Sequence, residues 1–438
     1  MSIAKRGEEG EEAPAQVGGD RIGELPDDLL HHVLSFLPAE EAVRTCVLAR
    51  RWRHLWRSAA GLRIGCRHAY RGTCVSDLRK FVDSLFLLRG GLPLDTCELK
   101  IGDFGSHDDV PRVNIWFRHA VMCNVQVLKL YVHKKEYAER WLELDDLPLI
   151  SHHLRTLKLH GVCCLASFLN FSSCPALEHL KFEYCDVSLA KKISSESIKS
   201  LKIIDSVFSD DFRIQIYAPN LVSLHLDVLS NMNPILESMP ALAEAFVRMT
   251  ESCRDRCYNL WGPNEHCECG SCPSSKNIGH GGNSCVLLKG LSEAKSLVLI
   301  SEPEMFIFKR DLRWCPMFSK LKTLLLNDYW CMSNDLRELA CLLEHSPVLE
   351  KLALQLFSEG PKHKIEMKGT FNSMERPVAI SEHLKIVEIK CKVIDERAFK
   401  VLKFLCTFNI KASAADCRRE ENLAVHGFAV CYCSETQG

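Results

Sequence analysis

The chain has few of the features that would place it in a membrane or on a secretory route. None of its apolar stretches approaches the about 18 uninterrupted residues of a bilayer-spanning helix, so no transmembrane segment is predicted. The first twenty residues are polar and acidic and lack the apolar core of a secretory signal. Net charge is nearly absent too, because 55 Lys and Arg balance 56 Asp and Glu. We therefore expect a protein of the cytoplasm or nucleus, in which only local patches attract charged partners.

The motifs of the common catalytic classes are also missing. The sequence contains no P-loop, no dinucleotide-binding glycine pattern, no nucleophile elbow and no H-E-x-x-H pair. His31 with His32, and His152 with His153, are adjacent along the chain, so we expect their side chains to diverge as exposed polar residues. We predict no catalytic residue and no cofactor, and we expect a protein that is not an enzyme.

What the sequence does contain is a repeat. The pattern L-x-x-L-x-L, or a close variant, occurs eleven times, and from Leu154 to Leu242 its first positions lie 23, 21, 23 and 21 residues apart. Leucine-rich repeats have periods of about 20–29 residues. Alternate leucines fall on one face of a short strand that cannot bury this face alone, so the units should stack in parallel. We predict an α/β fold in which residues 90–380 form an irregular leucine-rich-repeat solenoid (horseshoe). The alternative is a set of unrelated strands in an ordinary α/β domain.

The eleven copies share this spacing of apolar residues. They are Leu94-Cys97-Leu99, Val125-Leu128-Leu130, Leu154-Leu157-Leu159, Leu177-Leu180-Phe182, Ile198-Leu201-Ile203, Leu221-Leu224-Leu226, Leu242-Ala245-Val247, Ala294-Leu297-Leu299, Leu321-Leu324-Leu326, Leu349-Leu352-Leu354 and Leu384-Val387-Ile389. Side chains between the leucines should face solvent on the concave side, where a protein substrate would bind. The candidates are Thr156, Lys158, His160, Lys181, Glu183, His225 and Asp227, although each can also be an ordinary solvated strand residue.

A helical module is predicted over residues 20–62. Pro26 followed by two aspartates is typical of a helix start, and Pro38 ends the apolar stripe that follows. A second helix begins near Glu40, and a third short helix carries Trp52 and Trp56. At about forty residues the module is near the lower size limit for folding alone. Its surplus of apolar side chains therefore predicts a docking module.

The module closely resembles the F-box, above all that of plant proteins, in L-P-D-D-L-L-x-x-V-L-S-F-L-P and A-V-R-T-C-V-L-A-R-R-W-R-H-L-W. The resemblance implies the substrate-recognition subunit of an SCF-type (Skp–cullin–F-box) E3 ubiquitin ligase. It implies binding to the Skp adaptor, and through it to cullin and RING subunits. The positions carried over as adaptor contacts are Leu25, Pro26, Leu29, Leu30, Val33, Leu37 and Trp52, of which some must fill the module's own core.

The same segment is basic, with eight arginines and no acidic residue from Arg44 to Arg71. Clustered arginine among tryptophans can bind nucleic acid, whereas a solvated face that meets an acidic adaptor is the plainer interpretation. The alternative function is thus a repeat scaffold or a nucleic-acid-associated protein that acts outside a ligase.

The chain has 23 cysteines, and a cluster of them lies in a predicted Cys-rich insertion, residues 250–285. Cys269-x-x-Cys272 and Cys253-x-x-x-Cys257 can supply two ligand pairs for zinc. The alternative is a Gly-rich and Ser-rich insertion whose thiols have no specific role.

The two ends of the chain are predicted from pattern and composition. Residues 1–19 should form a disordered acidic terminus. Residues 381–412 give a strand and an amphipathic helix, which resemble the FBD-type tail of plant F-box repeat proteins and would cap the solenoid. Residues 413–438 lose both patterns and are expected to be an irregular tail.

Overall fold

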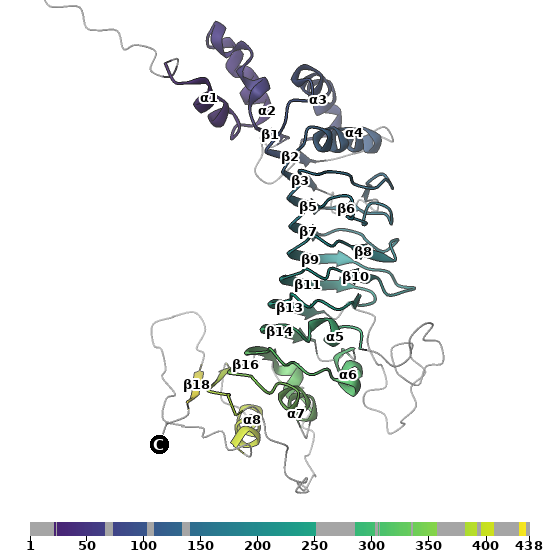
Figure 1. Ribbon diagram of the computed structural model, residues 1–438, viewed down its shortest axis with the longest axis vertical. Coiled ribbons are helices and arrows are strands. Elements are labelled where there is room, and N and C mark those ends of the chain that lie inside the picture. The colour runs from purple at the N-terminus through teal and green to yellow at the C-terminus, as the bar shows by residue number, and fades with distance from the viewer. Residues whose placement is uncertain are drawn as a thin grey trace, which may run out of the picture.

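The computed structural model describes residues 22, 24–65, 73–102, 109–133, 141–250, 285–302, 305, 307–333, 336–356, 382–391, 396–406 and 429–434. Thirteen strands of these segments form one sheet and follow one another across it in chain order (Figure 1). The remaining short strands form two smaller sheets. The first twelve strands of the main sheet pair in parallel. They are β1 (Gly61–Ile64), β2 (Thr96–Ile101), β3 (Val127–Val132), β5 (Thr156–His160), β7 (His179–Glu183), β9 (Ser200–Val207), β11 (Ser223–Ser230), β13 (Glu244–Met249), β14 (Ser296–Ser301), β15 (Thr323–Asn327), β16 (Lys351–Leu356) and β17 (Ile386–Cys391).

The predicted parallel stacking of the repeat strands is confirmed. The last two apolar residues of each of the eleven leucine patterns fall on one strand of the main sheet, and equivalent repeat positions lie opposite one another. Leu157, for example, pairs with Leu128 on one side and Leu180 on the other, and its side chain is fully buried. The sequence did not predict β1, because this strand carries only Leu62 and Ile64 as inward residues.

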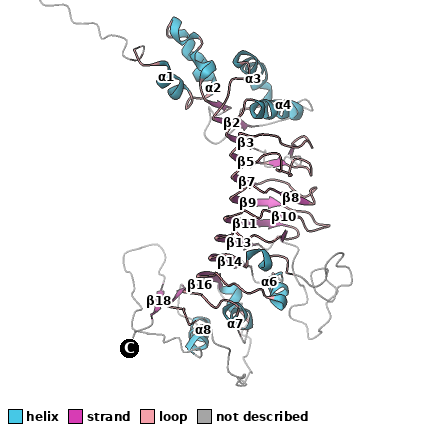
Figure 2. Ribbon diagram, viewed as in Figure 1, coloured by secondary structure: helices cyan, strands magenta, loops and turns pink. Residues whose placement is uncertain are grey.

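The stack is curved, with the main strands along its inner side and the connecting segments on its outer side (Figure 1). Strands pack about 4.8 Å apart whereas helices need about 10 Å, so helices on the outer side force the stack to bend. Figure 2 shows helices at both ends of the stack, and loops and short strands on the outer side of its middle. The outer elements are α3 (Val75–Arg89), α4 (Asp109–Met122), β4 (Leu142–Glu143), β6 (Val162–Cys163), β8 (Lys192–Ser194), β10 (Gln215–Tyr217), β12 (Ile235–Leu236), α5 (Leu288–Leu291), α6 (Ile307–Asp311) and α7 (Arg337–Glu344).

The N-terminal module consists of α1 (Asp27–Leu34) and α2 (Ala39–Arg44), each preceded by a proline cap, and three 3-10 turns. The turns are η1 (Thr45–Val47), η2 (Arg50–Arg53) and η3 (Leu55–Ser58). The third helix predicted from the sequence is thus two short turns, because the backbone of His54 leaves helical geometry between them. The module packs directly against β1. At Gly61 an added Cβ would lie 2.5 Å from the Ser35 carbonyl oxygen, so the close approach of α1 requires glycine there.

The C-terminal end contains α8 (Glu396–Cys406) and β18 (Ala429–Ser434). β18 pairs antiparallel with β17 over six residue pairs. This strand lies in the segment that the sequence predicted to be irregular, and its main chain covers the open edge of the sheet. Within the described segments, none of the helices combines the length and the apolar character of a membrane span. The terminus predicted to be disordered, residues 1–19, lies outside the described residues.

Candidate docking surfaces

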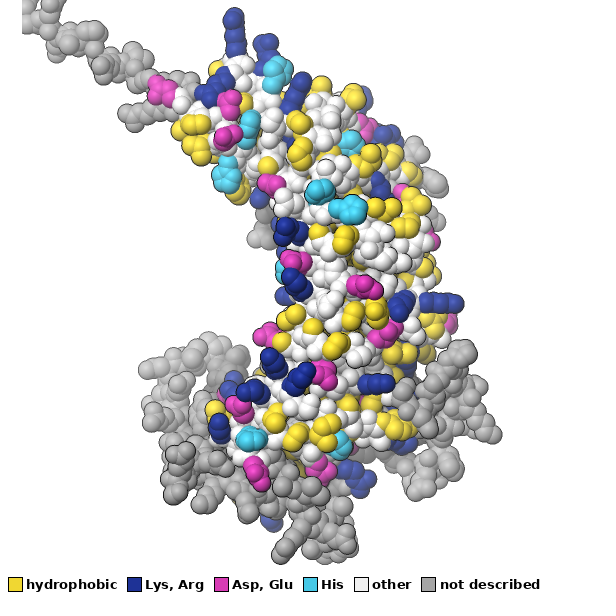
Figure 3. Space-filling model, viewed as in Figure 1, with side chains coloured by type: hydrophobic (Ala, Val, Ile, Leu, Met, Phe, Trp, Pro, Cys, Tyr) yellow, Lys and Arg dark blue, Asp and Glu magenta, His cyan; other side chains and the backbone are white. Residues whose placement is uncertain are grey.

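The N-terminal module exposes a group of large apolar side chains although its own core is closed. We call this group the helical apolar surface. Its members, with their exposed fractions, are Leu25 (37%), Leu29 (50%), Val33 (50%), Phe36 (57%), Val47 (83%) and Leu48 (66%). Figure 3 shows hydrophobic side chains gathered at the N-terminal end of the molecule, where α1 lies. Clustered apolar side chains of this size are typical of a surface that a partner covers.

The structure divides the adaptor contacts predicted from the sequence. Leu25, Leu29 and Val33 belong to the helical apolar surface, and Pro26 is exposed beside them. Leu30 and Trp52 are instead buried in the chain's own core, and Leu37 packs against that core as a half-buried residue. Sequence reasoning missed three exposed residues of this surface, Phe36, Val47 and Leu48. A signal was available, because each is an apolar residue outside the apolar stripe of the predicted helix.

Several of the clustered arginines make contacts within the molecule. The Arg51 guanidinium donates to the Asp27 carboxylate and, over 2.6 Å, to the Leu25 carbonyl oxygen. Arg44 pairs with Glu41 at 3.0 Å. Arg57 lies over the Trp56 ring, and Arg63 over the Phe36 ring. These contacts orient the helical apolar surface, and they leave fewer guanidinium groups for the phosphates of a nucleic acid.

A second candidate surface lies on the inner side of the stack. Four neighbouring strands carry a lysine at the same register position, between the two inward apolar residues. We call this set the lysine ladder, and it consists of Lys129, Lys158, Lys181 and Lys202. Adjacent rungs are about 4.8 Å apart at the backbone. Figure 3 shows Lys and Arg side chains along this inner edge, with acidic side chains among them.

The rungs of the lysine ladder are neutralised unevenly. Lys129 has Glu98 at 3.8 Å, and Lys181 has Glu183 at 2.6 Å. Neither Lys158 nor Lys202 has an ion pair with any residue of the described segments. Burial, and then the charges of the three other rungs, lower the pKa of Lys158. The ladder therefore holds positive charge in excess of its carboxylate partners.

Aromatic rings flank the lysine ladder on one side. The His160 ring lies 6.0 Å from Tyr131, 5.6 Å from His133 and 5.4 Å from Tyr184, measured between ring centroids. Thr156, at the start of the same strand, is half-buried and pairs with Val127 and His179. Burial lowers the pKa of His133, with smaller contributions from His160 and Lys100. These rings supply amphipathic contact area beside the charges.

The two strands after the ladder, β11 and β13, carry a histidine, an aromatic residue and an ion pair in place of further lysines. The His225 ring stacks on Phe246 with centroids 4.4 Å apart. Asp227 is buried; its Oδ1 accepts a hydrogen bond from Arg248 Nε at 2.8 Å, and its Oδ2 forms an ion pair with Arg248 Nη2 at 2.7 Å. Asp227 was predicted as a solvent-facing substrate contact, but it is 5% exposed because Arg248 of the neighbouring strand covers it. The other predicted inner-face residues are half-buried.

Sequence reasoning missed Lys129 and Lys202, which complete the ladder. A signal for them was present, since the tripeptides Leu128–Leu130, Leu157–Leu159, Leu180–Phe182 and Leu201–Ile203 all have lysine at their centre. Because successive residues of a strand point to opposite faces, the lysine between two inward residues lies on the outward face in all four repeats.

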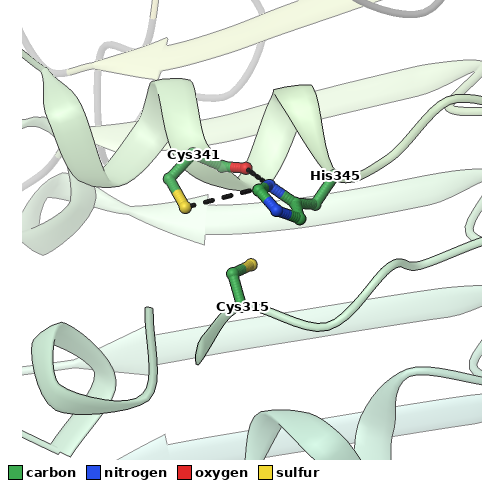
Figure 4. A group of neighbouring side chains, drawn as sticks. All are labelled: Cys315, Cys341 and His345. Atoms are coloured by element: carbon green, nitrogen blue, oxygen red, sulfur yellow. Dashed lines mark hydrogen bonds between the residues drawn. The ribbon is translucent and has the colours of Figure 1, made fainter. Parts of the chain in front are cut away.

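The described residues contain one cluster of candidate metal ligands, at the C-terminal end of α7. Cys315, Cys341 and His345 present ligand atoms that lie within 4.8 Å of one another, and Figure 4 shows their side chains converging. The His345 Nδ1 is 2.8 Å from the carbonyl oxygen of Cys341 and 3.9 Å from its Sγ. A hydrogen bond from the Cys315 thiol lowers the pKa of Cys341. Three donors are one fewer than the four of a closed structural zinc site. The cysteines predicted as zinc ligands, Cys253, Cys257, Cys269 and Cys272, lie outside the described residues.

Comparisons with known proteins find an F-box at the start of the chain and plant relatives that align with most of its length. Residues 22–61 match the F-box domain family. Two F-box/FBD/LRR-repeat proteins of Arabidopsis thaliana are each 29% identical to the chain; the alignments cover 85% and 88% of it, and 83% and 89% of their own lengths. An FBD-associated F-box protein of the same plant is 27% identical over 84% of the chain and 92% of its own length. The predicted resemblance is thus confirmed: the chain contains an F-box and is similar, over most of its length, to plant F-box/leucine-rich-repeat proteins of the FBD type.

Proposed function

We propose that the protein is the substrate-recognition subunit of an SCF-type E3 ubiquitin ligase. Its F-box would bind the Skp adaptor, which connects it to the cullin and RING subunits. The stacked strands would act as a leucine-rich-repeat solenoid that holds a protein substrate on the inner side. In this role the chain binds and positions proteins in the cytoplasm or nucleus, while its partner subunits perform the chemistry.

The helical apolar surface is the observation that carries this proposal. Leu29 and Val33 lie one turn apart on α1, and each side chain is half exposed. The neighbouring residues Leu30 and Leu34 of the same helix are buried. Covering a Leu or Val side chain contributes about 1.5–3 kcal/mol. Such side chains are costly to leave in water, so their exposure favours a partner that covers them. The adaptor contacts we propose are therefore Leu25, Pro26, Leu29, Val33, Phe36, Val47 and Leu48.

We propose a division of the chain that follows these roles. The F-box occupies residues 20–62, the repeats residues 90–380 and the FBD-type end residues 381–412. Leu30 and Trp52 act within this scheme as core residues that shape the F-box, because they are already covered by the chain itself.

Binding to the purified Skp adaptor tests the proposal. The double variant Leu29→Asp with Val33→Asp places two charges on the helical apolar surface without changing the buried core. Loss of two apolar contacts worth roughly 3 kcal/mol together should weaken adaptor binding about 100-fold, measured by titration calorimetry. The matched control is Leu147→Asp with Ile150→Asp, which alters two exposed apolar residues outside the F-box. Unchanged affinity in the first variant, or equal loss in both, would reject the proposal.

A further inference from the structure

The lysine ladder destabilises the sheet electrostatically, and the packing of the hydrophobic core does not require lysine at these positions. Like charges directly opposite one another on neighbouring strands destabilise a sheet. The outward positions are not constrained by the core, since the inward neighbours Leu157 and Leu159 fill it. A run of four lysines in register is therefore explained better by a ligand than by packing.

We propose that the lysine ladder binds an acidic segment of a protein, in an extended conformation and rich in Asp and Glu. This inference rests on the proposed function, in which the inner side of the stack receives the substrate. Lys158 and Lys202, which lack carboxylate partners within the described segments, contribute the charge that the acidic segment neutralises. Lys129 and Lys181 have carboxylate partners from the chain itself and alternate along the ladder with the two open rungs.

The dimensions of the ladder fit a short peptide. Four rungs at about 4.8 Å spacing span roughly 14 Å, which corresponds to about four or five residues of extended chain. Rings of His160 and Tyr184 lie at one side of this path and can contact the aliphatic parts of the segment. His225, stacked on Phe246, marks the end of the path because Lys202 is its register partner.

The neighbouring carboxylates favour a protein segment over a nucleic acid. Glu98 lies at the N-terminal end of the ladder, and Glu183 lies beside it on the third of its strands. The repeating phosphates of a nucleic acid would have to pass these acidic groups, whereas a protein segment can place neutral residues opposite them. A short cluster of carboxylates matches the local excess of positive charge more closely than a continuous polyanion does.

Fluorescence anisotropy with the full-length chain tests the inference. The probe is a labelled peptide of about ten residues that is rich in Asp and Glu, long enough to cross the ladder when extended. Its control is the same peptide with Asn and Gln in place of the acids. We expect the acidic peptide to bind, the amide peptide to bind at least tenfold more weakly, and the affinity of the acidic peptide to fall as salt rises.

Two charge-matched double variants locate the site. Lys158→Gln with Lys202→Gln removes the open rungs, and we expect at least about a fivefold loss of affinity for the acidic peptide. Lys192→Gln with Lys199→Gln removes the same charge from lysines that pair with Glu237 and Glu178, and the affinity should stay within twofold. Thermal unfolding should show that the first variant is at least as stable as the natural chain, because it removes repulsion.

Absence of binding, equal loss in both double variants, or tighter binding of a single-stranded oligonucleotide at the same lysines would overturn the inference. Adaptor binding is measured in parallel on the same samples. A chain that binds the adaptor but not the acidic peptide refutes only the ladder. A chain that binds the peptide through Lys158 and Lys202 but never the adaptor refutes the proposed ligase role and leaves the ladder intact.

Discussion

At the scale of single residues, the inner side of the stack holds a histidine whose charge depends on pH. Burial lowers the pKa of His225, so the imidazole is largely neutral at neutral pH. Its neighbours are Phe246, which stacks on it, and the charged groups Asp227, Lys202, Arg248 and Lys181. Because Asp227 is already bound to Arg248, protonation of His225 adds net positive charge at the end of the lysine ladder.

Affinity for the acidic peptide should therefore rise as the pH falls below the ordinary histidine pKa of about 6.5, because the lowered pKa of His225 moves its protonation to more acidic solution. A base with a lowered pKa in the folded state has its full stability above the unfolded pKa and loses it as pH falls. The thermal unfolding temperature should thus decrease over the same interval. Anisotropy titrations and melts of His225→Asn and the natural chain measure both effects. A rise in the variant as steep as that in the natural chain would contradict this role of His225.

At the scale of elements, one carboxylate joins two helices on the outer side. Asp311, at the end of α6, is fully buried and accepts backbone N–H groups of Val286, Leu287 and Leu288 over 2.7–3.1 Å. These groups open α5 and have no intrahelical acceptor. Burial raises the pKa of Asp311, whereas the three backbone donors lower it. The carboxylate thus anchors residues 286–288, which directly follow the predicted Cys-rich insertion, to the end of α6.

Asp311→Asn should lower the free energy of unfolding by roughly 2–4 kcal/mol, because the amide presents its NH₂ group to donors that need an acceptor. Urea denaturation followed by circular dichroism gives this value. Asp211→Asn, an exposed aspartate of the same chemistry, should change it by no more than about 0.5 kcal/mol. Equal effects in the two variants would show that Asp311 has no special part in the junction.

The strands were predictable element by element, whereas their surroundings were not. The leucine spacing predicted the eleven repeat strands because alternation along a strand and burial of one face are local properties of sequence. The short outer strands β4, β6, β8, β10 and β12 carry no such repeat and were not predicted. β1 was missed because two inward residues are too few to form a pattern. The third F-box helix was predicted where two 3-10 turns occur, since apolar spacing does not report the backbone break at His54.

The candidate sites depend on strand register, which the repeat spacing suggests and the strand pairing in the fold establishes. Lys158 and Lys181 were recognised singly as outward residues, but their alignment with Lys129 and Lys202 follows from strand pairing. Partition of the F-box residues into core and surface likewise follows from packing against β1. Leu29 and Leu30 are adjacent leucines in the sequence, yet one is half exposed and the other buried.

At the scale of the whole molecule, the F-box and the repeats share one continuous hydrophobic core. Leu30 and Trp56 belong to the same buried cluster as Leu62 and the inward leucines of the stack. Arg89 of α3 donates to the Trp56 carbonyl oxygen at 3.3 Å, and the Ala60 carbonyl oxygen accepts from the N–H groups of Asp95 and Thr96 at 2.8 and 3.2 Å. The F-box and the repeats therefore form one folding unit, although they are distinct in sequence.

This continuity predicts how fragments behave. A fragment of residues 1–65 retains α1 and α2 but loses the cover over Trp56 and Leu62, so it should melt without a cooperative transition in circular dichroism. A fragment of residues 1–133 keeps β1 to β3 with α3 and α4, and should melt cooperatively. Saturating Skp adaptor should restore a transition to the shorter fragment, because a ligand that binds only the folded state stabilises it by mass action. A cooperative melt of the free shorter fragment at the temperature of the longer one would show instead that the F-box folds independently, and that its apolar surface is tolerated without a partner.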